Sequence, residues 1–276
     1  MSKYLKQSAF TLIELLLVMV ILGILAVTSF AFINSGFNIY SQGVERQEAV
    51  AQARFMLTRL AKELRHAMPN SLRLSCENNC GLSQCLEFTP FQSATHYTGY
   101  LPNTAPFIVT AVDFELNDSA QPSIDDWASI YPLDPTEVYD VSNNKRLQLT
   151  NFVSSASSEL DQWQFDQAFA QESPAKRIYL LATPVSFCVE GTQLYRYQDY
   201  GFRNAQLDAV ELQSTSAVKR DLLALHIGNS LASNAFFRLS DTALTRNAVL
   251  NIHAVMAFND NEAMMFNHEV HIPNVP

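Results

Sequence analysis

The chain carries little charge for its length. Asp, Glu, Lys and Arg make up 16% of its 276 residues, whereas folded soluble domains usually contain about 25%. The shortage does not indicate disorder, because disordered chains are also poor in aromatic residues and this chain is 11% aromatic. With 8 glycines and 11 prolines, a collagen-like or linker-like chain is excluded. The length allows one large domain or two small ones, each with an adequate core.

Basic residues are also scarce, and the familiar catalytic motifs are missing. There are 18 Lys and Arg against 27 Asp and Glu, a formal net charge of −9. Nucleic-acid binding needs a basic face, so we expect no nucleic acid among the partners. The sequence contains no G-x-S-x-G, Walker A or G-x-G-x-x-G motif, which would indicate a nucleophilic serine or a nucleotide site. We therefore expect no enzymatic activity and no cofactor.

One segment approaches a metal motif without matching it. Residues 268–271 read His-Glu-Val-His, whereas the zinc-protease motif needs two histidines at i and i+4 on one helix face. In a strand, residues three apart point to opposite faces. We therefore expect no metal site at His268 and His271.

The first third of the sequence contains a long apolar run. Lys3 and Lys6 precede it, and residues 15–33 carry no charge. As a helix this run would be about 28 Å long, close to the hydrocarbon thickness of a bilayer. The basic residues on its N-terminal side place the N-terminus in the cytoplasm and send the rest of the chain across the membrane. The sequence thus predicts a single-pass inner-membrane protein with a periplasmic domain.

Three interpretations of this segment compete. It could be a cleaved secretory signal with an A-x-A-like site at residues 29–31, an uncleaved signal anchor, or a leader that is cut before the apolar stretch. Glu14 discriminates between them. A carboxylate within an apolar membrane helix costs on the order of 2.5–3.5 kcal/mol at the helix centre, and therefore rarely occurs there without a function.

Residues 9–14, Ala-Phe-Thr-Leu-Ile-Glu, resemble the cleavage and methylation motif of type IV prepilins, which pilins share with type II secretion pseudopilins. The resemblance implies that a prepilin peptidase cuts between Ala9 and Phe10 and methylates the new amine of Phe10. Residues 1–9 would then be the leader. The family usually has glycine before the cut, where this chain has Ala9, the smallest side-chain alternative.

The same resemblance implies a role in assembly for Glu14, which would be the fifth residue of the mature chain. When subunits leave the bilayer and bundle their N-terminal helices, a buried carboxylate needs a compensating charge. The amine of Phe10 on a neighbouring subunit would supply it and select the register of packing. The implied partners are other pilins and minor pilins, the prepilin peptidase, the inner-membrane assembly machinery and the lipid bilayer.

Beyond the apolar run the helical periodicity continues. Apolar residues recur at helical spacing at Ile33, Phe37, Tyr40, Val44, Ala53, Leu57, Leu60, Leu64 and Met68. Charged residues are expected to face elsewhere at Arg54, Arg59, Lys62, Glu63 and Arg65. Pro69 ends the pattern, and Gly36 and Gly43 could soften the middle. The sequence predicts one helix over residues 10–68, with a transmembrane half at 10–33 and an amphipathic half at 34–69.

Residues 70–276 have the shorter period of β-structure and are predicted to form a periplasmic globular domain. Strands are expected at 85–88, 107–114, 177–182, 185–189, 194–197, 222–227, 248–258 and 263–272, with a hairpin turn at 190–192. Residues 117–137 and 154–159 are expected to be loops. The predicted fold class is α+β, a long N-terminal helix packed on an antiparallel sheet domain with long loops or a second small β-layer.

Several other sequence segments resemble those of the minor pilin-like subunits of the mannose-sensitive haemagglutinin (MSHA) pilus system. They are residues 54–71, 85–88, 184–188 and 268–276. This resemblance implies a low-copy structural subunit for pilus assembly, initiation or the tip. Minor pseudopilins of type II secretion systems share the helix pattern and are the first alternative. A tip adhesin is the second, since an aromatic cluster at Tyr195, Tyr197, Tyr200 and Phe202 could bind a ligand, although a core role is expected for it.

Four cysteines, Cys76, Cys80, Cys85 and Cys188, indicate disulfides in an exported chain, and four cysteines allow three connectivities. We favour Cys85–Cys188, with Cys76–Cys80 as a small local loop. The alternatives are free thiols and a four-cysteine zinc site, for which the C-x3-C and C-x4-C spacings are loose.

Overall fold

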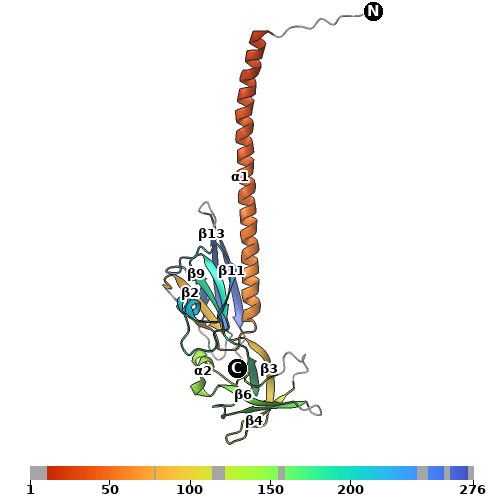
Figure 1. Cartoon of the computed structure of the whole chain (residues 1–276), viewed down its shortest axis with the longest axis vertical. Coiled ribbons are helices and arrows are strands. Elements are labelled where there is room, and N and C mark those ends of the chain that lie inside the picture. The colour runs from red at the N-terminus through yellow and green to blue at the C-terminus, as the bar shows by residue number, and fades with distance from the viewer. Residues whose placement is uncertain are drawn as a thin grey trace, which may run out of the picture. The chain divides into compact units, whose positions relative to one another are not determined.

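The computed structural model describes residues 11–77, 79–113, 122–154, 159–240, 248–257 and 262–272. The chain divides into two compact units, Met1–Val50 and Ala51–Pro276. Helix α1, Leu12–Leu64, belongs to both, because it crosses the boundary without a break (Figure 1). The architecture is α+β with antiparallel sheets, which confirms the predicted fold class.

The first unit consists of the exposed part of α1. Its large apolar side chains are exposed from Leu12 to Val44. Gly36 and Gly43 lie inside the helix, so neither glycine interrupts it. The expected start at residue 10 lies outside the described residues.

The end of α1 lies four residues before the predicted end. The helix stops at Leu64 because the residues after it form backbone hydrogen bonds with the segment that follows the strand Ser83–Phe88. The N–H of Met68 donates to the carbonyl of Thr89 at 2.8 Å, and the His66 carbonyl accepts from the N–H of Phe91 at 2.9 Å. Tertiary pairing therefore replaces the last turn that the apolar spacing predicted.

The second unit contains two antiparallel sheets beside the end of α1. One has the strand order β1-β2-β9-β10-β11 and the other the order β12-β13-β14. Their bounds are Arg73–Leu74 (β1), Ser83–Phe88 (β2), Val185–Glu190 (β9), Gln193–Gln198 (β10), Lys219–Ala224 (β11), Phe237–Leu239 (β12), Ala248–Ala257 (β13) and Ala263–Ile272 (β14). The hairpin turn at 190–192 is confirmed, as is the pairing of the last two strands.

Both sheets share one core with the end of α1. Met56, Leu60 and Leu64 are fully buried in a cluster that includes Phe187 from β9 and Met256 from β13. These helix positions follow the i, i+4 spacing that places side chains on one face. The amphipathic pattern at the end of the helix is therefore confirmed as a packing face.

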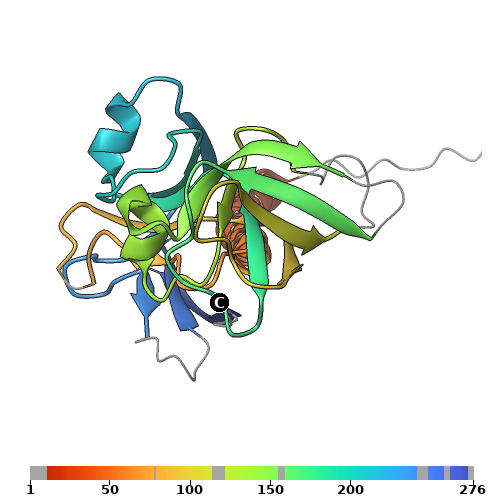
Figure 2. The ribbon, with the colours of Figure 1, turned by 90° about the horizontal axis from the view of Figure 1, so that it is seen from below.

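A six-stranded closed barrel forms the other part of the second unit, and the sequence did not predict it. Its strand order is β3-β4-β7-β6-β5-β8. The strands are Phe91–Thr98 (β3), Phe107–Val112 (β4), Trp127–Ser129 (β5), Arg146–Val153 (β6), Leu160–Phe165 (β7) and Arg177–Leu181 (β8). Its core surrounds the fully buried Trp163. In Figure 2 its olive-to-green strands are grouped apart from the blue strands of the last sheet.

The barrel is an insertion between two neighbouring strands. The chain leaves the five-stranded sheet after β2 and returns at β9, and β2 pairs with β9 along six residues. The two connections also touch, since the N–H of Ala182 donates to the carbonyl of Pro90 at 2.8 Å. The barrel thus enters and leaves the sheet at one place.

The prediction that residues 117–137 form a loop is wrong in its second half. Strand β5 lies there, and so does the start of helix α2, Pro135–Tyr139. The Asp134 side chain caps α2 by accepting from the N–H groups of Thr136 and Glu137, and Pro135 occupies the first turn, where its missing N–H costs nothing. Residues 114–121 and 155–158, within or next to the predicted loops, lie outside the described residues.

Candidate functional site

The N-terminal segment supplies the first candidate site. Ala9 and Phe10 lie outside the described residues, and Glu14 lies in the first turn of α1. The N–H of Glu14 donates to the carbonyl of Thr11 at 3.1 Å and approaches the Thr11 hydroxyl at 3.4 Å. A carboxylate in the first turn is favoured by the partial positive charge of the helix N-terminus. Glu14 itself is exposed and has apolar residues on both sides.

The helix that follows is long and apolar enough to cross a bilayer, and it is the one such helix among the described residues. Its one threonine in the apolar run, Thr28, donates its hydroxyl to the carbonyl of Leu25 at 3.0 Å. This bond removes the polar group from its surroundings, as a helix in lipid requires. A continuous exposed apolar surface of this length needs a cover, which a bilayer or the helices of neighbouring subunits would supply.

All four cysteines are in disulfides. Cys85 pairs with Cys188, and Cys76 pairs with Cys80, the connectivity that we favoured from the sequence. Cys85 and Cys188 are directly opposite each other on β2 and β9, so the bridge closes the point where the barrel is inserted. Disulfides of this kind fit an oxidising compartment such as the periplasm.

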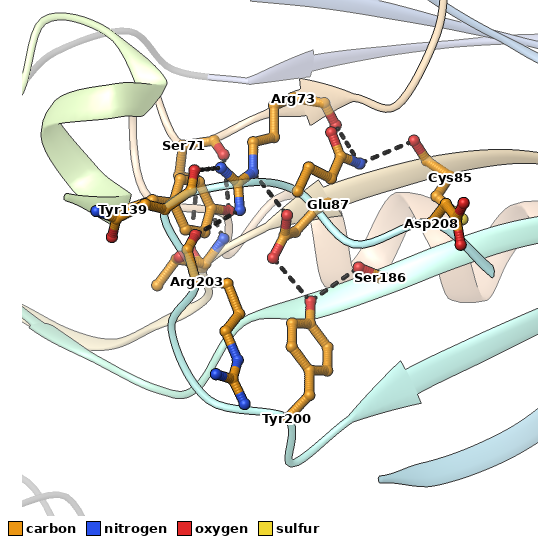
Figure 3. Close-up of polar contacts among 12 residues, drawn as sticks. Ser71, Arg73, Cys85, Glu87, Tyr139, Ser186, Tyr200, Arg203 and Asp208 are labelled. Atoms are coloured by element: carbon orange, nitrogen blue, oxygen red, sulfur yellow. Dashed lines mark hydrogen bonds and ion pairs between the residues drawn. The ribbon is translucent and has the colours of Figure 1, made fainter. Parts of the chain in front are cut away.

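A buried ionic cluster beside this disulfide is the second candidate site (Figure 3). The Nε of Arg73 on β1 donates to the carboxylate of Glu87 on β2 at 2.6 Å. The Tyr200 hydroxyl lies 3.0 Å from the other Glu87 oxygen and 2.8 Å from the Ser186 hydroxyl on β9. The Glu87 side chain is 1% exposed. Burial, the largest cause, raises the pKa of Glu87, while Arg73 and Tyr200 partly offset the rise.

The guanidinium group of Arg73 extends the cluster to two further segments. It donates to the carbonyls of Asn204 and Arg203 at 2.7 and 2.8 Å, and it lies over the ring of Tyr139 at 3.6 Å. Tyr139 ends helix α2 and donates its hydroxyl to the carbonyl of Ser71 at 3.0 Å. The cluster therefore ties the sheet to α2 and to the segment after β10. With its acid and base paired and withdrawn from solvent, it is suited to fixing these segments rather than to binding a substrate.

The aromatic cluster does not form an exposed platform. Tyr197 and Tyr200 are buried beside the Cys85–Cys188 disulfide, and Phe202 packs against the guanidinium group of Arg146 at 3.7 Å. Tyr195 is half-buried, with the Arg220 guanidinium group 3.5 Å from its ring centre. The core interpretation of these residues is therefore confirmed for Tyr197 and Tyr200.

Glu63 is the one helix charge whose predicted outward position is wrong. It accepts from the Nε of Arg196 on β10 at 2.8 Å, and it also pairs with Arg59 one turn earlier on α1. This ion pair fixes the end of the helix to the sheet. No local sequence signal identifies it, because the partners are separated by 133 residues.

The sequence predictions for metal binding concern His268 and His271. Both lie on β14, where His268 is half-buried and His271 is exposed on the other face, as the strand period requires. Within the part of the chain that the structure describes, no group of three or more His, Cys, Asp or Glu residues is placed to hold a metal ion.

Comparison with known proteins identifies one similarity. Residues 4–30 match the family described as the prokaryotic N-terminal methylation motif. No curated protein and no solved structure matches the chain. The match includes Ala9, Phe10 and Glu14 and supports a type IV pilin-like or pseudopilin protein with a prepilin-type leader. Such a leader implies processing by prepilin peptidase and assembly with other pilins, and the apolar helix suggests membrane anchoring.

Proposed function

We propose that this chain is a minor pilin-like structural subunit of an MSHA-type pilus, similar to MshO, which acts in pilus assembly, in initiation or in the tip complex. The observation that carries the proposal is a methylation motif at residues 4–30 that leads directly into an exposed apolar helix. The sequence segments 54–71, 85–88, 184–188 and 268–276 resemble MshO and so support the MSHA assignment.

In this proposal the first half of α1 has two successive environments. After cleavage before Phe10 and methylation of its amine, the helix anchors the subunit in the inner membrane with its N-terminus in the cytoplasm. The folded unit then lies in the periplasm, where its two disulfides form. On assembly the same apolar surface moves from lipid into contact with other helices, and Glu14 pairs with the Phe10 amine of a neighbour.

The role is structural, and we propose no catalytic activity and no cofactor. The Glu87 carboxylate is 1% exposed and hydrogen-bonded to Arg73 and Tyr200, so it offers no accessible acid or base to a substrate. Other pilins and minor pilins, the prepilin peptidase, the inner-membrane assembly machinery and the bilayer are the proposed partners. Nucleic acid is not among them, because the net charge of −9 opposes phosphate binding.

Two related functions remain alternatives. A minor pseudopilin of a type II secretion system would carry the same motif, as would the minor pilin PilW. A tip adhesin is favoured by one observation, the closed barrel inserted between β2 and β9, which adds a folded module that helix packing does not require. Deletion of the gene would reduce MSHA filaments if the chain is an MSHA subunit. It would reduce secretion if the chain is a pseudopilin, and only attachment if it is a tip adhesin.

The mature N-terminus tests the proposal directly. We expect the intact mass and N-terminal sequence of the protein from membranes to show a chain that begins at Phe10 and carries one added methyl group. A chain that begins at Phe32 would instead identify a conventional signal peptide. In that case the soluble domain could not enter a filament through its N-terminal helix, and the proposed function would be rejected.

A further inference from the structure

The edges of the two sheets differ in how they are protected. Native proteins limit edge pairing with short strands, charges, prolines or bulges. Strand β1 has two residues and β12 has three, while β11 begins with Lys219, Arg220 and Asp221 and has a register shift against β10. Strand β14 has ten residues in continuous register with β13 and contains neither lysine nor proline. Its one acidic residue is Glu269, so β14 is the longest and least protected edge of these two sheets among the described residues.

The hydrogen bonds on the other side of β13 determine which backbone N–H and C=O groups of β14 face its free edge. The N–H of His253 donates to the Phe236 carbonyl, and the Val255 carbonyl accepts from the N–H of Gly228. Odd-numbered residues of β13 thus bond away from β14, and even-numbered residues bond to it. Since even residues of β13 are opposite even residues of β14, the odd residues of β14 direct their N–H and C=O groups to the free edge. No described backbone group bonds to them.

The side chains of β14 indicate which residues a strand paired with its free edge would need. The first half is apolar, with Met264 and Phe266 half-buried on the inner face and Met265 70% exposed on the outer face. The second half is polar on the outer face, where Glu269 is exposed, and apolar on the inner face, where Val270 and Ile272 are buried. An added strand would complete the burial of Met264 and Phe266, and a cationic residue placed opposite Glu269 would complement its charge.

We propose that the free edge of β14 accepts an extended strand from a different subunit of the same assembly. That strand has apolar residues over Met264 and Phe266 and a lysine or arginine opposite Glu269. This inference rests on the proposed function, because it assumes that the chain assembles with other pilin-like subunits. A strand is the ligand that offers alternating donors and acceptors at the spacing of an edge. A second copy of β14 does not meet this requirement, because residues 263–272 contain no lysine or arginine to stand opposite Glu269.

Proline at an odd position tests the edge without breaking the β13–β14 ladder. In the Asn267→Pro variant the lost N–H points to the free edge, so the sheet keeps its internal bonds. We expect at least a tenfold reduction of this variant in sheared filaments, measured by immunoblot against wild type. The matched Asn267→Ala variant should remain within twofold. Filament levels of Asn267→Pro within twofold of Asn267→Ala would overturn the inference.

A second pair of variants tests the edge without proline, so the inference stays testable if the Asn267→Pro variant does not fold. Met265→Lys places on β14 the kind of charge that protects β11, and we expect the same tenfold reduction in filaments. Leu222→Lys is its control, because Leu222 is an exposed apolar residue on the edge strand β11. Equal incorporation of the two lysine variants would contradict the role of β14, whatever the proline variant does.

Hydrogen exchange on the full chain measures the contact itself. The amides of residues 265, 267, 269 and 271 should exchange rapidly in the detergent-solubilised subunit and become protected at least tenfold in filaments. Filaments that contain the subunit without this protection would overturn the inference while leaving the proposed function intact. If no wild-type subunit is found in filaments, the proposed function fails as well. Binding of a synthetic 263–272 peptide to the full chain would show that a second copy is the occupant and would overturn the proposed partner.

Discussion

The side-chain amide of Gln84 hydrogen-bonds both backbone polar groups of Phe237. Its Nε2 donates to the Phe237 carbonyl at 2.9 Å, and its Oε1 accepts from the Phe237 N–H at 2.9 Å. Oε1 also accepts from the N–H of Phe236 at 3.0 Å. Gln84 is fully buried on β2, and Phe237 begins β12. One side chain thus joins the two sheets that no continuous ladder connects.

We expect the Gln84→Leu variant to be destabilised by at least about 3 kcal/mol. The leucine would leave two buried backbone N–H groups and a carbonyl without partners, and each orphaned buried group costs on the order of 1–3 kcal/mol. Urea unfolding of the full chain in detergent measures the change. Gln162→Leu, at an exposed position on β7, is the matched control and should change the free energy of unfolding by less than about 0.5 kcal/mol. Equal losses in the two variants would contradict the bridging role.

The two disulfides should contribute unequally to stability. Cys85 and Cys188 are 103 residues apart and Cys76 and Cys80 only 4. In the chain-entropy model the long loop contributes about 4–5 kcal/mol and the short loop about 2 kcal/mol. We therefore expect the Cys85→Ala, Cys188→Ala double variant to lose more free energy of unfolding than the Cys76→Ala, Cys80→Ala double variant. The reverse order, measured by urea unfolding, would show that loop length does not determine their effect here.

The sequence predicted those parts of the fold that depend on local patterns. Residues 15–33 could be recognised as a helix by their uniform hydrophobicity, and the predicted apolar positions Ala53, Leu60 and Leu64 are buried in the core. The β9–β10 hairpin was predictable because Gly191 lies between two strand-like runs. In the structure Gly191 has φ +57°, a conformation that glycine adopts without strain.

The barrel and the buried clusters could not be predicted in this way. Strand β5 has three residues, too few to show a period. Arg73 and Glu87 have no sequence pattern that marks them as partners, and Arg196 reaches Glu63 across 133 residues. Such contacts depend on which strands become neighbours, and this depends on the topology of the whole unit.

The burial of Glu87 predicts a pH dependence of stability. Its raised pKa means that the folded protein holds this proton to a higher pH than the unfolded chain does. Its contribution to stability is therefore complete at acidic pH and is lost as the pH rises from the ordinary value of 4.5 through the raised pKa. The free energy of unfolding of wild type minus that of Glu87→Gln should decrease with pH in this range.

Urea titrations of the two proteins at several pH values between about 4 and 7 provide this difference, in the range where carboxyl groups with raised pKa values titrate. Glutamine is the suitable replacement because it is neutral and similar in shape. Its amide oxygen can still accept from Arg73, and its NH2 group can donate to the Tyr200 hydroxyl, which then acts as the acceptor. A difference that increases with pH would mean that Arg73 outweighs burial and lowers the pKa of Glu87.

The last prediction concerns Glu14 and separates processing from assembly. Cleavage before Phe10 takes place on a single subunit, whereas charge pairing between Glu14 and the Phe10 amine needs a neighbour. We therefore expect the Glu14→Ala variant to be cleaved and methylated like wild type, and to be at least tenfold depleted from sheared filaments. Such a depletion corresponds to at least about 1.4 kcal/mol if incorporation is an equilibrium. Glu45→Ala is the matched control, because Glu45 is a carboxylate on the same helix beyond the apolar run. Mass spectrometry of the membrane fraction measures processing, and immunoblots of sheared filaments measure incorporation. If Glu14→Ala entered filaments as well as Glu45→Ala, the carboxylate would not select the register, and the apolar surface of α1 alone would drive assembly.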